Sequence, residues 1–406
     1  MKERPDNLGN IHDCWLLPDG VEEVLPQDAR RIEKLRRRLI DLFDAWGYDL
    51  VMPPLVDYLE SLLSGTGHDV ELKTFTLTDQ LTGKMMGVRA DMTPQVARID
   101  SHNFQRGEPS RLCYIGSVLH TLPDGLSGQR NPIQVGAELY GHDGIESDAE
   151  IISLMLESLK LAGFHNVHVD VGHMGVFRSL VQAAGLSDVI EEQLFAAMQR
   201  KATFDLVELL DRIEISNQFR RMFLALVDLN GGTDVIIKAR EQLRYAPETV
   251  ILCLDRLEKI AELVELRSGG KHLHFDLSEL RGYRYEQGVV FAAFVPGRGQ
   301  EIARGGRYDG IGEVYGQSRP AVGFSADLKS LVNLMQEEQD KERATVLAPC
   351  IYDVNLVREV NRLREEGRRV VWVLPDHGGN LSNVEGASVM TKVGEHWMIG
   401  TADEER

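Results

Sequence analysis

Residues 114–141 carry two apolar, strand-like runs that flank a loop of Pro, Asp, Gly and Ser. The stretch reads YIGSVLHTLPDGLSGQRNPIQVGAELYG. Two such runs joined by a turn-rich loop predict a long β-hairpin, whose strands pair antiparallel. Elsewhere strand and helix patterns follow one another without the regular βαβ alternation of a doubly wound sheet. We therefore expect an α+β fold, in which helices pack on an antiparallel sheet.

The same hairpin raises a question about chemistry. A hairpin that wraps around a phosphorylated substrate is expected to present arginines, because guanidinium groups bind phosphate with two hydrogen bonds. This one contains a single arginine, Arg130. Two interpretations stay open at this point: catalytic machinery, or a hairpin from which the catalytic groups have been lost.

Length and composition exclude several classes of protein. A chain of 406 residues with 43% hydrophobic residues can bury a sizeable core and suggests more than one folding unit. It has neither a long apolar run nor a signal-peptide pattern, so we expect a cytoplasmic protein without a membrane span. The formal net charge of −18 opposes attraction to nucleic acid. Four cysteines without a CxxC pair indicate neither a metal site nor a disulfide framework.

Hydrophobic periodicity gives a coarse map of the chain. Apolar residues at three- and four-residue steps predict a helix over 28–46, and residues 75–88 read as two strands around a turn. Residues 180–265 read as a mostly helical insertion, and GGRYDG at 305–310 reads as a tight turn. The charged run QEEQDKER marks a boundary. We expect one domain over 1–335 and a small C-terminal α/β domain over 344–406.

The first candidate site lies in GVRADMTPQVAR, where Asp91 and Thr93 stand between Arg89 and Arg98. A carboxylate accepts charge-assisted hydrogen bonds from an ammonium group, so Asp91 could hold an amino group. The alternative is that Asp91 or Thr93 caps the helix that Pro94 begins.

The second candidate site lies in NPIQVGAELYG. Because strand side chains alternate, Gln134, Gly136 and Glu138 share one face. The bare glycine between two polar groups predicts space for a small ligand. The alternative is a solvated strand face.

The third candidate site pairs ELRGYRYEQGVVF with ARGGRYDGIGEVYG. Each stretch places arginine and glycine beside tyrosine, and Arg281, Tyr283 and Tyr285 stand in the first. Arginine can bind a carboxylate, while tyrosines can form an aromatic wall. The alternative is a pair of turns with surface arginines.

At these three places the chain resembles histidyl-tRNA synthetase, a class II aminoacyl-tRNA synthetase. The likeness covers about the first 335 residues and includes VRADMTPQVAR, QVGAELYG, LRGYRYEQGVVF and GGRYDGIGEVYG with PAVGF. It implies the antiparallel class II sheet with flanking helices and a histidine-shaped pocket. The residues it implies for histidine binding are Asp91, Thr93, Gln134, Glu138, Arg281, Tyr283 and Tyr285. Glu286 stands where the family has the second tyrosine of a pair.

The departures from the family pattern fall on the ATP site. The arginine and glutamate of motif 2 are replaced by His120 and Leu122, and the arginine of motif 3 by Ser330. These losses imply a chain with no catalytic residues and no cofactor. The short segment after residue 343 replaces an anticodon-binding domain, so we expect no tRNA partner.

A synthetase-like chain with these losses is similar to the regulatory subunits of ATP phosphoribosyltransferase. This resemblance implies a short-form catalytic subunit as partner, histidine as allosteric ligand, and a role in the first step of histidine biosynthesis. It also implies a homodimer core within a hetero-oligomer that is a hetero-octamer in this family. The core pairs through motif 1, here the helix 28–46 and the strand that runs to Pro54. The alternatives are an active histidyl-tRNA synthetase and an amino-acid sensor of another partner.

Overall fold

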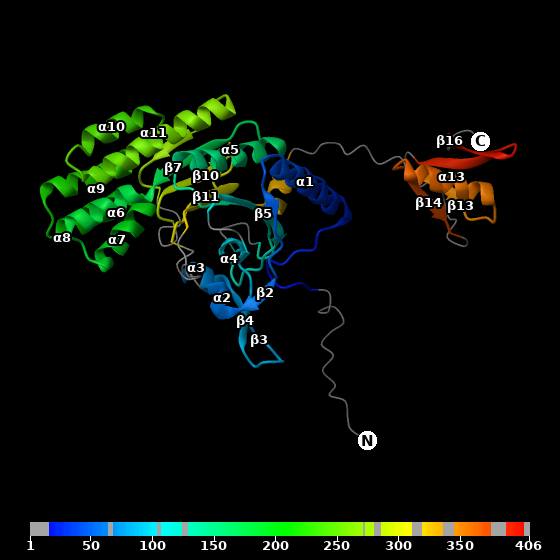
Figure 1. Cartoon of the computed structure of the whole chain (residues 1–406), viewed down its shortest axis with the longest axis horizontal. Coiled ribbons are helices and arrows are strands. Elements are labelled where there is room, and N and C mark those ends of the chain that lie inside the picture. The colour runs from blue at the N-terminus through cyan, green and yellow to red at the C-terminus, as the bar shows by residue number, and fades with distance from the viewer. Residues whose placement is uncertain are drawn as a thin grey trace, which may run out of the picture. The chain divides into compact units, whose positions relative to one another are not determined.

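The structure of the protein is a computed structural model, which describes residues 16–63, 68–103, 107–123, 129–270, 273–279, 286–310, 319–335, 345–374 and 387–401. The chain forms two compact units, Met1–Met335 and Gln336–Arg406 (Figure 1). The second unit begins at the first residue of the charged run QEEQDKER. None of the helices in the described ranges has the length and apolarity of a membrane span.

A nine-stranded sheet forms the centre of the first unit in the described residues. In spatial order its strands are β1 (Asp49–Leu50), β5 (Ser110–Ser117), β6 (Ile133–Tyr140), β12 (Ala321–Asp327), β11 (Ala303–Arg307), β10 (Val289–Phe294), β7 (His168–His173), β9 (Leu273–Asp276) and β8 (Asn230–Gly231). The expected hairpin is present, because β5 pairs antiparallel with β6 from Ser110 opposite Tyr140 to Ser117 opposite Ile133. Only β1–β5 and β7–β9 are parallel pairs among the described strands of this sheet. The expected α+β class is confirmed.

Helices cover one face of this sheet and bury its apolar residues. They are α1 (Pro26–Ala45), α5 (Ile145–Leu161) and α12 (Leu328–Leu334). On α1 the buried residues are Ile32, Leu35, Leu39 and Phe43, which follow the helical period read from the sequence. Phe43 meets Phe324 of β12 edge to face, with ring centroids 6.3 Å apart.

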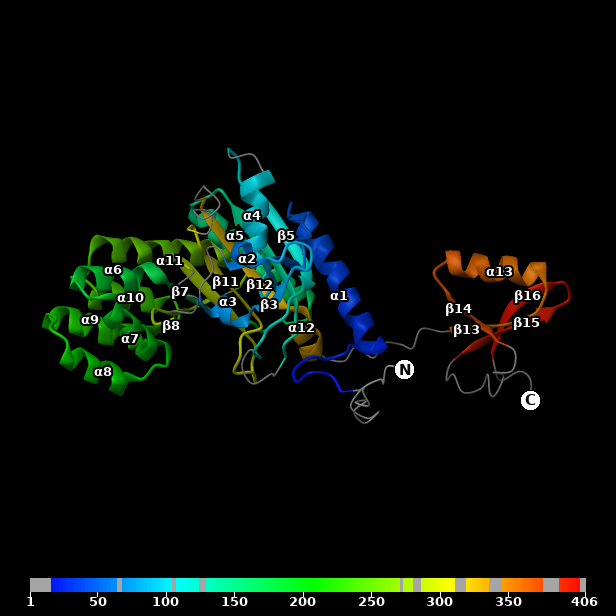
Figure 2. The ribbon, with the colours of Figure 1, turned by 90° about the horizontal axis from the view of Figure 1, so that it is seen from below.

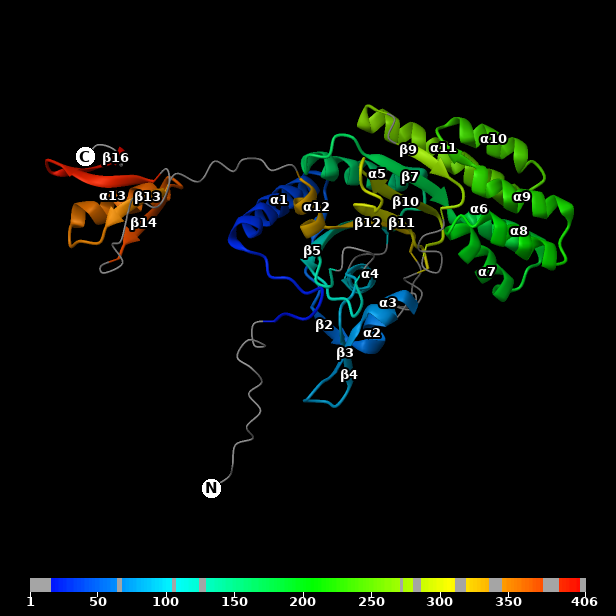
Figure 3. The same cartoon turned by 180° about the vertical axis from the view of Figure 1, so that it is seen from behind.

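Residues 174–268 form six consecutive helices beside the sheet (Figure 3). These are α6 (Met174–Ala184), α7 (Asp188–Gln199), α8 (Thr203–Arg212), α9 (Asn217–Asp228), α10 (Asp234–Gln242) and α11 (Glu248–Ser268). Their buried side chains, such as Phe177 and Phe223, belong to the same apolar core as the sheet. The core is therefore continuous from the sheet into these helices.

A smaller layer lies near the other face of the nine-stranded sheet (Figure 2). It consists of the three-stranded sheet β2 (Val56–Tyr58), β4 (Met85–Val88) and β3 (Phe75–Thr78), with α2 (Leu59–Leu63), α3 (His68–Lys73) and α4 (Thr93–Asn103). Strands β3 and β4 pair around the turn expected at LTGK, residues 81–84. This layer brings the start of α4 to the open face of β6.

The second unit contains a four-stranded sheet in its described residues, ordered β14 (Arg369–Val373), β13 (Thr345–Pro349), β15 (Ser388–Val393) and β16 (His396–Thr401). Helix α13 (Val354–Glu365) connects β13 to β14, which lie parallel, so the βαβ unit read from the sequence is present. Its buried residues Leu356, Val360 and Leu363 pack against Val346 and Val370 of the sheet.

The prediction of a tight turn over residues 305–310 is wrong for the first half of this range. Gly305, Gly306 and Arg307 belong to β11, which pairs with both β10 and β12. These two glycines are required by packing, because a side chain at Gly305 would overlap the ring of Phe291 and one at Gly306 would overlap the carboxylate of Glu286. Sequence reading took the glycines for turn signals, whereas they make room for neighbours inside a strand.

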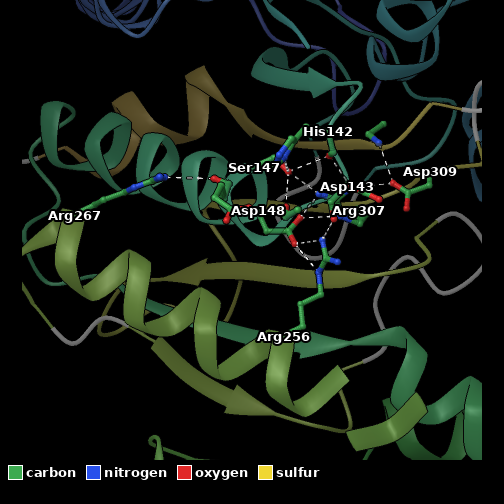
Figure 4. Close-up of polar contacts among 11 residues, drawn as sticks. His142, Asp143, Ser147, Asp148, Arg256, Arg267, Arg307 and Asp309 are labelled. Atoms are coloured by element: carbon green, nitrogen blue, oxygen red, sulfur yellow. Dashed lines mark hydrogen bonds and ion pairs between the residues drawn. The ribbon is translucent and has the colours of Figure 1, made fainter. Parts of the chain in front are cut away.

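A buried polar network joins β11 to α5 and α11 (Figure 4). The Arg307 guanidinium donates to the Asp148 carboxylate at 2.8 Å and to the Ser147 hydroxyl at 2.9 Å. Arg256 of α11 donates to the second carboxylate oxygen of Asp148 at 2.7 and 2.9 Å. Asp148 is fully buried, and the Arg307 side chain is 3% exposed. Arg307 therefore acts in the fold, and it is not the ligand clamp that the sequence pattern allowed.

Substitution of Asp148 by Ala is expected to destabilise the first unit by about 3–5 kcal/mol, because it removes the buried carboxylate that the guanidinium groups of Arg307 and Arg256 share. Urea unfolding followed by circular dichroism measures this loss. Glu33→Ala is the control, because Glu33 pairs with Arg37 on the surface at 2.9 Å and should change stability by less than about 1 kcal/mol. Equal unfolding midpoints for the two variants would contradict the role given to Asp148.

Candidate functional site

Strand β6 carries the polar pair that the sequence placed on one face. Gln134 and Glu138 do point the same way, but the space expected over Gly136 between them is filled. The phenol of Tyr114 lies there, since Tyr114 stands opposite Gly136 in the β5–β6 pairing and a side chain at Gly136 would overlap its hydroxyl. The glycine accommodates Tyr114, and the expectation of open space at that point is wrong.

Glu138 is the polar centre of this face and is 1% exposed. Its Oε1 accepts hydrogen bonds from the Tyr114 hydroxyl at 2.9 Å and the Thr93 hydroxyl at 3.1 Å. Its Oε2 accepts one from the Tyr308 hydroxyl. Tyr140 packs edge to face against Tyr308, with ring centroids 6.4 Å apart. Hydroxyl groups from three separate elements thus hold the carboxyl group.

Burial raises the pKa of Glu138 to about 8, although the hydroxyls of Tyr308, Tyr114 and Thr93 oppose the shift and Asp91 adds to it. A glutamate with this pKa is largely protonated at pH 7. Buried groups whose pKa is shifted this far by desolvation are typical of functional sites.

Asp91 and Gln134 lie next to this centre and bind each other. The Gln134 amide donates to Asp91 Oδ1 at 2.8 Å, and its oxygen accepts from the Met92 amide at 2.9 Å. Asp91 Oδ1 also accepts from the Thr93 amide at 3.0 Å, which is a capping contact at the start of α4. The alternative given for Asp91, a cap of the helix that Pro94 begins, is therefore present at Oδ1. Among the described residues, no hydrogen bond is made by Asp91 Oδ2.

Four of the seven residues expected to bind histidine thus come together: Asp91, Thr93, Gln134 and Glu138. The other three, Arg281, Tyr283 and Tyr285, lie outside the described residues. Glu286, just before β10, reaches the same face with its carboxylate over Gly306 of β11. Burial raises the pKa of Glu286 well above its usual range.

The sequence motifs gave no place in the site to Tyr114 and allowed Tyr308 only as part of an aromatic wall. One signal for Tyr114 was available, since a large residue on β5 stands opposite a glycine on β6. Tyr308 follows β11 and meets Glu138 only after β11 and β12 have paired. That contact depends on strand order, which the sequence does not state.

The residues at the lost ATP positions have contacts of their own within the fold. The His120 ring lies 2.9 Å from the Ala90 carbonyl through Nε2 and is buried, whereas Leu122 is exposed. The single hairpin arginine, Arg130, donates to the carbonyls of His120 at 2.9 Å and Asp19 at 3.0 Å. Its guanidinium also stacks on Phe75. Arg130 therefore links the two sides of the hairpin loop to each other and to the segment that contains Asp19.

Ser330, at the motif 3 position, lies in the first turn of α12 and donates to Asp327, the residue that caps this helix. Its hydroxyl donates to Asp327 Oδ2 at 2.6 Å, and the same oxygen accepts from its amide at 3.1 Å. Asp327 Oδ1 accepts from the Ile133 amide of β6 at 3.0 Å. The serine is thus used for a helix start and offers no positive charge.

The remaining arginines of the first candidate site have structural contacts. Arg89 donates to the carbonyls of Pro53 at 2.6 Å and Ser117 at 2.9 Å, and Arg98 pairs with Asp57 at 2.5 Å. In the described ranges, no three His, Cys, Asp or Glu side chains gather as metal ligands do.

Two family models match the chain. The model described as histidyl-tRNA synthetase matches residues 20–331, and the model described as the C-terminal domain of the ATP phosphoribosyltransferase subunit HisZ matches residues 343–399. A structure described as an ATP phosphoribosyltransferase regulatory subunit/histidyl-tRNA synthetase, from Bacillus halodurans, superposes with a TM-score of 0.83 at 23% identity. It covers 93% of this chain and 99% of its own. Histidyl-tRNA synthetase from Nostoc superposes with a TM-score of 0.73 at 18% identity over 89% and 86%. The expected class II synthetase-like fold is confirmed.

Curated relatives match nearly the whole chain. One from Alkalilimnicola ehrlichii is 55% identical over 91% of this chain and 92% of its own length. One from Thioalkalivibrio sulfidiphilus is 51% identical over 95% and 98%. Both carry the name ATP phosphoribosyltransferase regulatory subunit. By this similarity, which confirms the resemblance read from the motifs, the chain belongs to the family of ATP phosphoribosyltransferase regulatory subunits.

Proposed function

We propose that this chain is a non-catalytic regulatory subunit that works with a short-form catalytic subunit of ATP phosphoribosyltransferase in the first step of histidine biosynthesis. Histidine bound in the synthetase-like pocket mediates feedback inhibition of the complex. The observation that carries the proposal is the identity of 55% over 91% of the chain with a relative named as such a subunit.

The polar groups of the pocket suit a free amino acid. Histidine presents an ammonium, a carboxylate and an imidazole ring with donor and acceptor nitrogens. Asp91 binds Gln134, and Thr93 binds Glu138. The Asp91 carboxylate and the Thr93 hydroxyl oxygen can therefore accept from an ammonium at this place. The resemblance assigns Arg281 to the carboxylate and Tyr283 or Tyr285 to the ring.

The contacts at the former ATP site support a non-catalytic role. His120 and Ser330 are each bound to groups of the fold, and Leu122 offers no polar atom. A hydrogen bond to a charged group contributes about 1.5–3 kcal/mol. Loss of two arginine contacts to phosphate therefore removes several kcal/mol of stabilisation from an adenylation transition state.

A homodimer core is also proposed, paired through α1 and the segment that follows it. Apolar side chains lie exposed on both sides of Pro54: Met52 is 75% exposed, Leu55 49% and Tyr58 42%. Several exposed apolar side chains close together in the chain are typical of a protein interface. The large negative net charge argues against a tRNA partner.

The regulatory role predicts a requirement for the subunit in the complex. Mixing the chain with a short-form catalytic subunit should produce a larger species in size-exclusion chromatography, and histidine should inhibit the activity of this complex.

Glu138→Ala should weaken histidine binding at least tenfold, because the ligand group that Glu138 binds is then buried without a partner. The same variant should desensitise the complex to histidine while the activity without histidine remains. The exposed Glu214→Ala is the control. Wild-type inhibition of the Glu138→Ala complex would exclude this pocket as the regulatory site.

Loss of the ATP contacts predicts that the chain alone has no synthetase activity. Histidine-dependent exchange between ATP and pyrophosphate should stay at background, and no tRNA should be aminoacylated. An active histidyl-tRNA synthetase assayed in parallel shows that the conditions support exchange. Exchange well above background would instead favour the synthetase alternative.

The exposed apolar residues around Pro54 predict a dimer in the absence of any partner. Light scattering at micromolar concentration should give twice the chain mass of 45.5 kDa. Leu55→Asp should shift the population toward monomer, because it places a charge in a self-complementary interface. A wild-type monomer at this concentration would refute the dimer.

A further inference from the structure

A cavity of about 330 Å³ lies among the ends of three helices of the first unit. Trp46, directly after α1, lines it together with side chains from the second half of α5, from the segment before β7 and from the end of α11. No described residue of the site around Glu138 lines it. Its volume is at the lower end of the range for ligand pockets, so the cavity has room for one small molecule.

The inner surface of the cavity is apolar and partly aromatic. Leu156 and Val167 are 8% and 4% exposed and belong to the main apolar core. The rings of Trp46 and Phe164 pack against the same core and also line the cavity. The Trp46 indole N–H donates to Glu157 Oε2 at 3.0 Å, so the polar edge of this ring already has a partner. These two rings therefore offer a ligand apolar surface, on which a flat group can stack.

The exposed side chains of the lining carry mostly positive charge. Lys160 of α5 and Arg267 of α11 are both exposed, and so is His165. Glu157 is the single acidic residue in the described lining. The net charge of the whole chain is −18, so the surface as a whole repels anions, whereas the cations at this cavity attract them.

The two cations are available to a ligand. The Lys160 ammonium has no hydrogen bond or ion pair with another described residue. The Arg267 guanidinium donates to the Glu146 carbonyl at 3.5 Å, which is longer than an ordinary hydrogen bond. Both cations lie in the last turn of their helices, where a positive charge complements the helix dipole. That effect acts through space and occupies none of their N–H donors, so these donors remain for an anionic group.

We propose that this cavity is a second binding site, for a small organic anion with a flat apolar body. The rings of Trp46 and Phe164 hold the apolar body, and Lys160 and Arg267 bind the anionic group. The inference does not depend on the proposed function, because the cavity and the pocket around Glu138 share no described residue. A free amino acid is a poor ligand for this cavity, since its ammonium group would meet two cations.

Anilinonaphthalene sulfonate is a suitable probe, because it joins aromatic rings to one sulfonate and becomes fluorescent in apolar surroundings. Titrated into the folded full chain, it should show saturable binding. Arg267→Ala and Lys160→Ala should each weaken this binding about fivefold, because each removes one cation from the anionic group. Lys238→Ala is the control and should match wild type, since Lys238 pairs with Asp234 on the exposed surface of α10 at 2.7 Å. Circular dichroism verifies that each variant is folded.

Glu157→Gln tests the sign of the charge effect. The substitution removes the negative charge of the lining, while the amide oxygen can still accept from the Trp46 indole. The probe should therefore bind about threefold more tightly. Adsorption to an apolar surface alone predicts no such opposite response to the removal of a cation and of an anion. Unchanged affinity in Arg267→Ala, Lys160→Ala and Glu157→Gln would overturn the proposal.

A neutral probe separates charge from shape. Phenylnaphthylamine has the same rings without the sulfonate, so wild type should bind it about tenfold more weakly, and Arg267→Ala should bind it as wild type does. Equal affinity of wild type for the two probes would overturn the assignment of an anionic ligand. Excess histidine should leave the sulfonate probe bound. Competitive displacement by histidine would instead place the probe in the pocket around Glu138 and overturn the second site.

Discussion

The pocket depends on the burial of one carboxyl group in the face of an antiparallel sheet. Glu138 lies on a central strand, where water is excluded and an isolated carboxylate would be costly. Hydroxyl groups from Thr93, Tyr114 and Tyr308 meet it there, and they come from α4, β5 and the end of β11. The carboxyl group therefore has all three of these hydrogen-bond donors only when each of the three elements is in place. The position of Glu138 thus couples the hairpin, the small layer that contains α4, and the far strands of the sheet.

The glycines around Glu138 follow from the same constraint. Gly136 accommodates Tyr114, and Gly323 accommodates the carboxyl group of Glu138 itself. Any side chain at these positions would displace a polar group that the pocket contains. Gly306 stands in the same relation to Glu286. Backbone positions without side chains therefore shape this site as much as the polar residues do.

The positions that the resemblance assigns to an ATP site are bound to other groups of the fold. A synthetase places positive charge on the phosphates from the hairpin and from the start of the last helix of its catalytic domain. Here the hairpin arginine binds backbone carbonyls, and Ser330 donates to Asp327, which caps α12. These contacts stabilise the same elements without presenting a charge. The residues that the resemblance assigns to the amino acid lie together at the same time, and on this combination the proposal of a ligand-sensing chain depends.

The sequence by itself determined the local elements and the motif residues. The hairpin, the first helix and the βαβ unit were readable because hydrophobic period and turn residues are local signals, and the motifs carried Asp91, Thr93, Gln134 and Glu138 to one site. Tertiary structure decided which neighbours fill the space around them. Tyr114 over Gly136, Tyr308 at Glu138 and the strand that contains Gly305 and Gly306 all depend on strand order and register. These are contacts between residues far apart in the chain, and no local pattern specifies them.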